Sequence, residues 1–260
     1  MVIRMIPMWT TFIMFGVVIS IRKTYFLDQA NHMNHELGKL NVPLLIFKFI
    51  SDLDLFNEYV KEQVHKPYVK LAENLNIPKR YVPPIGIFVA MLFSILCCIT
   101  AAGMETRRLD MIRRHLLLDK PNDSNEKIPM SVFWLIPQFL LLGAAEGMSG
   151  FSIGQFFTNQ APALWRRYLI DFSYGFIGAG TVGSVLSVYV VGKFSESGGR
   201  TNWFQDTLNK SRLDNYYWTL TVLSCINLFL YILVASQYTY RDPRDEDADE
   251  TSMNEELTQP

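Results

Sequence analysis

The sequence of 260 residues has little cysteine and no excess of positive charge, and each absence excludes classes of protein. Its three cysteines, Cys97, Cys98 and Cys225, all lie inside apolar runs, where we expect buried small hydrophobic side chains. A disulfide framework needs more cysteines in polar loops, and a zinc site needs nearby histidine or acidic ligands. The formal net charge of −1 lacks the basicity typical of nucleic-acid-binding proteins, so no nucleic-acid partner is expected.

The sequence also lacks the motifs that carry enzyme chemistry. It contains no Ser/His/Asp set, no zinc-ligand spacing and no P-loop. His32, His35 and His115 stand in or near expected polar loops, where a solvated side chain is more common than a metal ligand. We therefore expect that the protein is not an enzyme and that it uses no metal and no cofactor.

One stretch, GAGTVG at 178–183, does fit the dinucleotide-binding pattern G-x-G-x-x-G. That pattern needs a strand before it, a helix that begins at it, and an acid about 20 residues further on. Here the glycines stand in the middle of an uncharged run, so an NAD-dependent oxidoreductase is the least supported hypothesis. Small residues also recur there every four positions, at Gly175, Ala179, Gly183 and Ser187, and Gly180 and Ser184 widen the stripe that they form. On a helix they form one stripe, which predicts close packing against another helix in lipid.

Long runs without charge are what the sequence has in abundance. Hydrophobic residues make up 49% of the chain, although it also contains polar loops and an acidic end. A helix that crosses a membrane needs about 20 mostly apolar residues. The sequence therefore predicts an all-α membrane protein whose six helices form one bundle in a lipid bilayer. The expected spans lie at about 2–30, 42–60, 81–104, 130–157, 170–192 and 215–240.

The second of these spans is degenerate. It contains Lys48, Asp52, Asp54 and Glu58, and four charges are costly in hydrocarbon. Either it crosses the membrane only when packed against other helices, or it lies at the interface. The bundle is expected to end at about residue 240, and the acidic stretch 241–260 to be a disordered tail.

Glu146 is the candidate functional residue, because it interrupts a long apolar run that should cross the membrane. A carboxylate at that depth normally faces protein or a water-filled cavity. On a helix, Gln138 and Ser149 fall on the same side as Glu146 and give that side a polar flank. We expect these three residues to bind a substrate or protons. The alternatives are a structural carboxylate paired with a neighbouring helix, or a charge near the membrane surface.

Several longer stretches together resemble one family of transporters. They are RMIPMW, GMETRRLDMIRRH, IPMSVFWLIPQFLLLGAAEG, FFTNQAP and NWFQDTLNKSRLDNYYW, in that order along the chain. They are similar to segments of the plant nitrate/peptide transporter family, which are relatives of the proton-dependent oligopeptide transporters within the major facilitator superfamily. The resemblance covers nearly all residues from Arg4 to Tyr240. It matches only the six-helix C-terminal half of a twelve-helix carrier.

This resemblance implies proton-coupled secondary transport of small solutes such as nitrate or di- and tripeptides. It places Glu146 at the position of a glutamate that lines the central cavity in the family. An acid that the family has shortly before FF is Gln155 here, and the family's proton-coupling residues of the first helix have no counterpart. The expected partners are a small-molecule substrate, protons and a missing N-terminal half.

The alternative is a truncated half-transporter that inserts in the membrane but does not transport alone. The resemblance further implies a plasma-membrane or vacuolar protein with both ends in the cytoplasm, whereas the basic residues of the loops do not by themselves favour that orientation.

Overall fold

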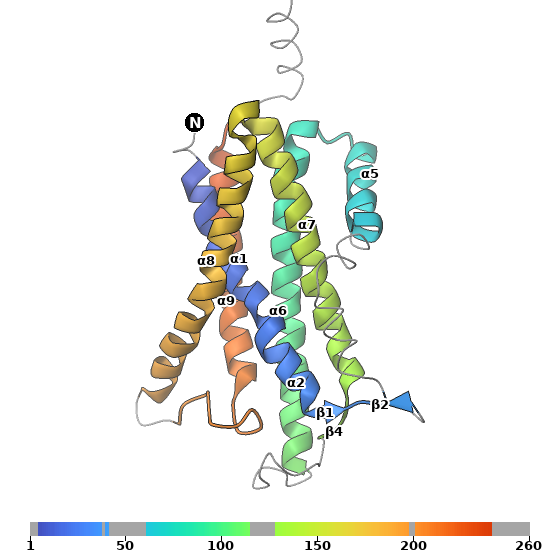
Figure 1. Ribbon diagram of the computed structural model, residues 1–260, viewed down its shortest axis with the longest axis vertical. Helices are drawn as coiled ribbons and strands as arrows, with labels where there is room; N and C mark the ends of the chain where they lie inside the picture. Colours follow the sequence, from blue (N-terminus) through green and yellow to red (C-terminus); the bar gives the residue numbers. More distant parts are fainter. Residues whose placement is uncertain (1–4, 38–39, 42–60, 115–127, 198–200, 241–260) are drawn as a thin grey trace, which may run out of the picture.

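The computed structural model describes residues 5–37, 40–41, 61–114, 128–197 and 201–240; the expected second span at 42–60 and the tail at 241–260 lie outside them. Within these ranges, five helical segments are long and apolar enough to cross a membrane. Their bounds are Ile6–Asn31, Lys79–Arg114, Val132–Gln160, Leu164–Glu196 and Leu213–Gln237. They stand side by side as one bundle (Figure 1).

The first span is a single rod made of three segments. The helix α1, Ile6–Ile21, continues through a π-helical turn, η2, Arg22–Phe26, into the short helix α2, Leu27–Asn31. Pro7 stands in the first turn of α1, where its missing N–H costs no helical hydrogen bond. Charged residues therefore lie within the rod rather than after its end.

The helix α6, Val82–Arg114, also runs further than the uncharged run at 81–104 predicts. It follows the 3-10 turn η4, Lys79–Tyr81, and its second and third residues are prolines. Beyond Met104 the helix continues through charged residues because Glu105 and Arg108 are buried and form an ion pair with each other. Packing of this pair replaces the water that the charges would otherwise need.

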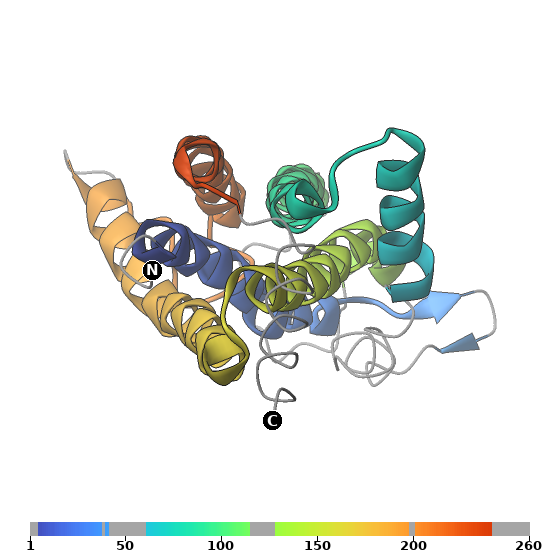
Figure 2. The same cartoon turned by 90° about the horizontal axis from the view of Figure 1, so that it is seen from above.

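A short link connects the third described span to the fourth, whereas a longer segment separates the fourth from the fifth. The 3-10 turn η6, Val132–Leu135, leads into α7, Ile136–Gln160, and a two-residue link joins α7 to α8, Ala163–Glu196. The helix α9, Leu213–Gln237, completes the bundle. In the view from above, α6 lies between α7 and α9, and α1 lies against α8 (Figure 2).

Short elements close one end of the bundle. The strand β1, Met33–Asn34, pairs in parallel with β4, Ile128–Ser131, and so joins the end of the first span to the start of the third described one. The strands β2, Glu36–Leu37, and β3, Leu40–Asn41, form a hairpin. Toward the other end, a π turn, η3, Lys61–His65, leads into α5, Lys66–Asn74, which packs beside α6 and α7 through these two segments.

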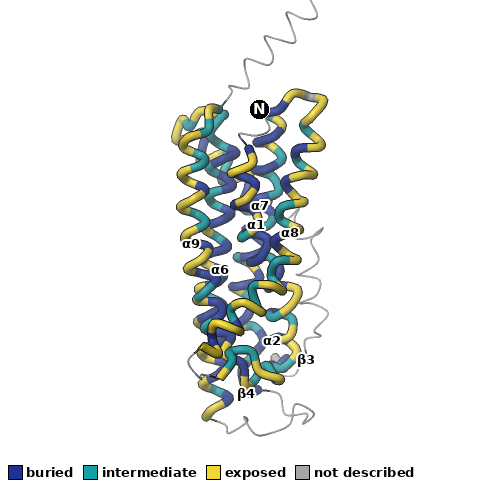
Figure 3. The backbone as a smooth tube through the Cα atoms, turned by 90° about the vertical axis from the view of Figure 1, so that its left-hand side faces the viewer, coloured by how far each residue is buried: buried dark blue, intermediate teal, exposed yellow. Residues whose placement is uncertain are grey.

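The outer faces of α8 and α9 carry most of the exposed apolar surface. In an apolar stretch of 18 residues taken from each span, 17% of the residues are buried in α8 and 22% in α9, against 56% in each of the other three spans. Figure 3 shows the exposed residues along these two helices. Such faces suit contact with lipid or with another helical unit rather than with water. Cys97 and Cys98 are buried as expected, whereas Cys225 is exposed on α9, so the expectation of burial is wrong for that residue.

The GAGTVG stretch lies in the middle of α8, which is helical without a break from Ala163 to Glu196. No strand precedes it, so the dinucleotide-binding geometry is absent from this part of the described chain. The close contact of α8 is with α1, through Gly16 and Gly180: a Cβ on Gly180 would lie 1.9 Å from the Ile13 carbonyl oxygen. The predicted stripe is in the wrong register for this contact, because Gly175 and Gly183 have nothing within 4 Å of such a Cβ and Ala179 is exposed. Its last member, Ser187, shares a hydrogen bond with the Tyr216 hydroxyl of α9, at 2.8 Å.

Candidate functional site

Glu146 forms an ion pair with Arg22 inside the bundle. Glu146 comes from the middle of α7, and Arg22 from the point where α1 passes into η2. The guanidinium Nη2 donates to the carboxylate Oε2. The Arg22 side chain is 1% exposed and that of Glu146 is 9% exposed, so both charges are almost fully removed from solvent. This ion pair thus links the first span to α7 inside the bundle.

The backbone around Arg22 is itself unusual. Arg22 is the first residue of the π-helical segment η2, which ends at Phe26 and then returns to α-helix. A π turn widens the helix by one residue and is frequent at functional sites. Here it directs a buried cation toward α7 while the rod remains continuous. The π-helical segment thus begins at the residue that supplies the buried cation.

Arg22 has more donors than the ion pair uses. Its Nε and Nη1 atoms are buried and have no hydrogen-bond partner among the residues that the structure describes. A buried donor without a partner costs about 1–3 kcal/mol, and more when the group is charged. These two donors are available to an anion or to water. The pair is therefore a site with unused binding capacity.

The two other predicted site residues lie on the same helix but not at the ion pair. Gln138 is fully buried, and its amide donates to the Gln29 side-chain oxygen at 3.5 Å, which is the limit of a hydrogen bond. Its own Oε1 has no partner in the described part of the chain. The Ser149 hydroxyl donates to the Glu146 backbone oxygen at 2.8 Å and lines a small apolar cavity beside Phe12 and Phe15.

A second buried ion pair lies nearer the end of the bundle that the strands close. Arg108 donates to both carboxylate oxygens of Glu105, from Nε at 2.8 Å and from Nη2 at 2.7 Å. Gln29 adds a third hydrogen bond to Glu105, at 2.7 Å. Arg108 also donates to the Asn209 side chain at 2.9 Å and to the Leu208 carbonyl at 3.1 Å, in the segment before α9. Unlike the Arg22–Glu146 pair, the Glu105–Arg108 pair has hydrogen bonds to several neighbouring groups, which indicates a structural role.

Gln29 links this cluster to the predicted site helix. It belongs to α2, in the same rod as Arg22, and it contacts both Glu105 of α6 and Gln138 of α7. Polar contacts therefore run between three spans at two levels of the bundle. Among the described residues, no group of three or more His, Cys, Asp or Glu side chains is arranged to hold a metal.

Sequence reasoning identified Glu146 but missed Arg22, Gln29, Glu105 and Arg108. Arg22 and Gln29 fall inside the expected span 2–30 without being singled out, and Glu105 and Arg108 follow the expected span 81–104. A usable signal was present: Glu105 and Arg108 are three residues apart, the spacing at which opposite charges meet on a helix. The partner of Glu146 has no such signal because Arg22 lies 124 residues away in sequence.

Comparison with known proteins supplies the family. Residues 1–204 match the model of the POT family. Protein NRT1/PTR FAMILY 5.5 from Arabidopsis thaliana is 39% identical over 249 residues, which are 94% of this chain and 45% of that protein. Protein NRT1/PTR FAMILY 8.1 from the same plant is 32% identical over 92% of this chain and 41% of its own length. The chain thus spans less than half the length of these relatives.

A solved structure agrees with the predicted fold. The structure described as an auto-inhibited POT family peptide transporter superposes with a TM-score of 0.63 at 14% identity, over 92% of this chain and 42% of that one. The likeness confirms the predicted fold class: the chain is a bundle of long apolar helices that shares the fold of a little under half of that structure. The family match over residues 1–204, the relatives and the arrangement of spans lead to one assignment: this chain belongs to the POT family.

Proposed function

We propose that this chain is the C-terminal half of a twelve-helix, proton-coupled carrier for small solutes such as nitrate or di- and tripeptides. Membership of the POT family supports transport in general, and the names of the relatives suggest these solute classes. The observation that carries the proposal is the buried pair of Arg22 and Glu146, with two unused guanidinium donors. Its role is in carriage of a solute across the plasma or vacuolar membrane, not in catalysis.

Arg22 is suited to bind the anionic group of such a solute. A guanidinium presents its N–H groups in a plane that matches the two oxygens of a carboxylate or of nitrate. The Nε and Nη1 atoms are the donors left over from the Glu146 contact, and each can donate a hydrogen bond; both bidentate edges of the guanidinium include Nη2, which becomes available when Glu146 releases it. A solute bound there would lie between α1 and α7, at the depth where Glu146 interrupts the apolar run.

Glu146 supplies the group that a proton can neutralise. While it is ionised, it holds Arg22 and competes with the anionic solute for the same guanidinium. A proton on the carboxylate removes that competition, so proton and solute would bind together more readily than separately. Rocking of two six-helix halves about this site would then expose it to alternate sides of the membrane. Gln138 and Ser149 remain proposed as polar neighbours in the opened cavity.

A second candidate function is a half-transporter that inserts in the membrane but does not transport alone. The exposed apolar face of α8 favours it, because this chain leaves that face uncovered. In a complete carrier, we propose that an N-terminal half covers it and supplies the other cavity wall. Uptake of nitrate and of a dipeptide by cells that express this chain alone separates the two: uptake without any partner would contradict the half-transporter hypothesis.

Replacement of Glu146 by glutamine tests the transport proposal. The substitution is best made in a fusion of this chain to the first six helices of the 39% identical Arabidopsis relative. The glutamine amide can neither take up nor release a proton, so uptake of the transported solute should lose its pH dependence and fall by about 5- to 150-fold, the usual range of a coupling between two binding sites, although Arg22 stays free for the solute. Insertion should be unchanged.

The control is Glu73→Gln on α5, the same chemical change at an exposed carboxylate. It should leave the uptake rate and its pH profile as in the parent fusion. Unaltered uptake kinetics and pH dependence in the Glu146→Gln protein would remove Glu146 from the mechanism.

A further inference from the structure

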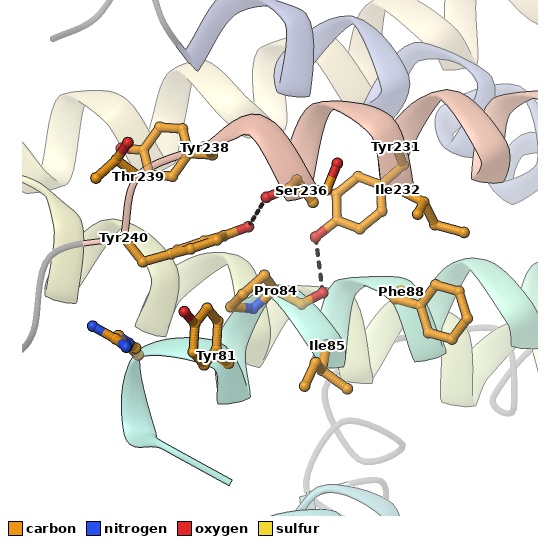
Figure 4. A pocket seen from close by; sticks show the side chains of 12 residues that line it. Tyr81, Pro84, Ile85, Phe88, Tyr231, Ile232, Ser236, Tyr238, Thr239 and Tyr240 are labelled. Carbon is orange, nitrogen blue, oxygen red and sulfur yellow. Dashed lines mark hydrogen bonds between the residues drawn. The ribbon is translucent and has the colours of Figure 1, made fainter.

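A pocket of about 480 Å³ lies between the first turns of α6 and the end of α9, far from the Arg22–Glu146 pair in sequence (Figure 4). It is found at the end of the bundle opposite the strands, where α6 begins and α9 ends (Figure 1). Its lining is mostly aromatic and aliphatic, with one serine, one threonine and one cation besides four tyrosines. The lining residues are Arg80, Tyr81, Pro84, Ile85, Phe88, Tyr231, Ile232, Ala235, Ser236, Tyr238, Thr239 and Tyr240.

Hydrogen bonds hold the walls of this pocket in place. The Tyr231 hydroxyl donates to the Pro84 carbonyl at 2.8 Å and so joins α9 to α6 (Figure 4). Beyond the end of α9, the Tyr240 hydroxyl donates to the Ala235 carbonyl, also at 2.8 Å, which folds the chain back over the opening. Burial raises the pKa of Tyr240 to about 12, so this phenol stays neutral and remains a donor at physiological pH. The hydrogen bonds thus fix the pocket walls. The Tyr240 ring adds no negative charge to the pocket.

Three tyrosine rings line its outer end. Tyr240 lies 5.4 Å from Tyr81 and 5.1 Å from Tyr238, measured between ring centroids. Tyrosine is enriched where a membrane protein crosses the level of the lipid headgroups, because its ring is apolar and its hydroxyl is polar. This end of the pocket therefore matches the headgroup level of a bilayer.

Arg80 gives the same end a positive charge without a carboxylate partner in the described chain. Its guanidinium lies 4.9 Å from the centre of the Tyr81 ring, and its Nε atom is buried without a hydrogen-bond acceptor among the described residues. The ion pairs of the structure's described part do not include Arg80. A buried donor on a cation favours an anionic acceptor that the protein itself does not provide.

The inner end is apolar and leads toward the lipid-facing surface. Ile85 and Phe88 lie one and two turns into α6, and Ile232 faces them from α9, at the opposite end from Tyr240 (Figure 4). The outer faces of these helices continue with exposed apolar side chains, among them Leu92 and Phe229. A ligand with one anionic end and one long apolar end fits this arrangement, whereas a free phosphate ion would leave the apolar part unused.

We propose that this pocket binds an anionic phospholipid, with its phosphate at Arg80 and one acyl chain along Ile85, Phe88 and Ile232. The Ser236 and Thr239 hydroxyls lie near the level at which the glycerol esters would stand. Because the ligand bridges the start of α6 and the end of α9, it adds to the contact that Tyr231 makes between the same helices.

Native mass spectrometry of the purified chain with added lipid tests this proposal. Phosphatidylglycerol should bind about 10-fold more tightly than phosphatidylcholine with the same acyl chains: both lipids carry the phosphodiester, but the choline ammonium of the second would stand beside Arg80 and weaken its attraction to the phosphate. The Arg80→Gln protein should lose this preference, and Arg80→Lys should keep most of it. The matched control is Lys79→Gln, which removes an adjacent exposed charge outside the pocket and should keep the full preference.

Two further arms separate the possible sources of the anion. Inorganic phosphate and glycerol phosphate, at the same concentration as the lipid, should not displace it, since neither fills the apolar end. Equal binding of the two lipids by the parent chain, an unchanged preference in Arg80→Gln, or displacement by phosphate alone would each overturn the proposal. Melting temperatures of all four proteins, measured without lipid, show whether a variant has lost its fold. If Arg80→Gln is unfolded, the lipid preference of Arg80→Lys tests the site: a kept preference supports the proposal, and a lost preference in a folded Arg80→Lys protein contradicts it.

Discussion

Replacement of Arg22 by methionine should lower the free energy of unfolding by about 3–5 kcal/mol, because removal of one partner leaves a buried charge uncompensated. The charge left behind is the Glu146 carboxylate, 9% exposed, in the middle of α7. Methionine has a similar length and no charge, so the change removes the ion pair while much of the packing remains. Thermal unfolding of the purified proteins in one detergent, at fixed pH and salt, measures the difference.

The double variant Arg22→Met/Glu146→Gln provides the internal test of this explanation. Replacing a buried ion pair by neutral side chains of similar volume is often neutral or stabilising, so the double variant should recover most of the loss. Lys23→Met is the matched control: Lys23 is the next residue, is exposed, and should lose less than about 0.5 kcal/mol as other surface changes do. If Arg22→Met unfolds together with Lys23→Met, the pair contributes nothing to stability.

The helical spans could be predicted from the sequence because the requirement that creates them is local. Every backbone polar group in hydrocarbon must bond within its own helix, and about 20 apolar residues in a row satisfy that need. The continuation of α6 to Arg114 could not be predicted in the same way. It depends on Glu105 and Arg108 being buried by partners on other elements, namely Gln29 and Asn209.

The candidate site, too, could be predicted only in part from the sequence. A carboxylate inside an apolar run is visible in one dimension, which is why Glu146 could be named. Its pairing with a neighbouring helix was one of the alternatives, and the structure shows that pairing. The partner cannot be identified from the sequence, since Arg22 stands 124 residues away and begins a π-helical segment that no residue pattern predicts. Binding of substrate at Glu146 remains a prediction beside this structural role.

Gly180→Ala should destabilise the chain by about 3 kcal/mol or more, at the upper end of what overpacking costs, because its neighbour is backbone and cannot move aside. The added Cβ would lie 1.9 Å from the Ile13 carbonyl oxygen and 3.0 Å from the Gly16 Cα. Gly16 meets α8 in the same way, with 2.0 Å between its added Cβ and the Ile177 carbonyl oxygen. Either alanine forces α1 and α8 apart along their whole contact. Detergent-solubilised thermal unfolding again provides the measurement.

Alanine at two other glycines of α8 should raise the stability instead of lowering it. Gly175 and Gly183 have nothing within 4 Å of an added Cβ, so Gly175→Ala and Gly183→Ala gain helix propensity, up to about 1 kcal/mol, without a clash. Equal destabilisation by all three alanines would show that this α1–α8 contact does not decide stability. In the twelve-helix fusion the outcome carries a second meaning. If Gly175→Ala or Gly183→Ala is harmless in this chain but destabilises the fusion, the small-residue stripe packs against the other half of the carrier. The fourfold pattern in the sequence would then describe a contact that this chain alone does not make.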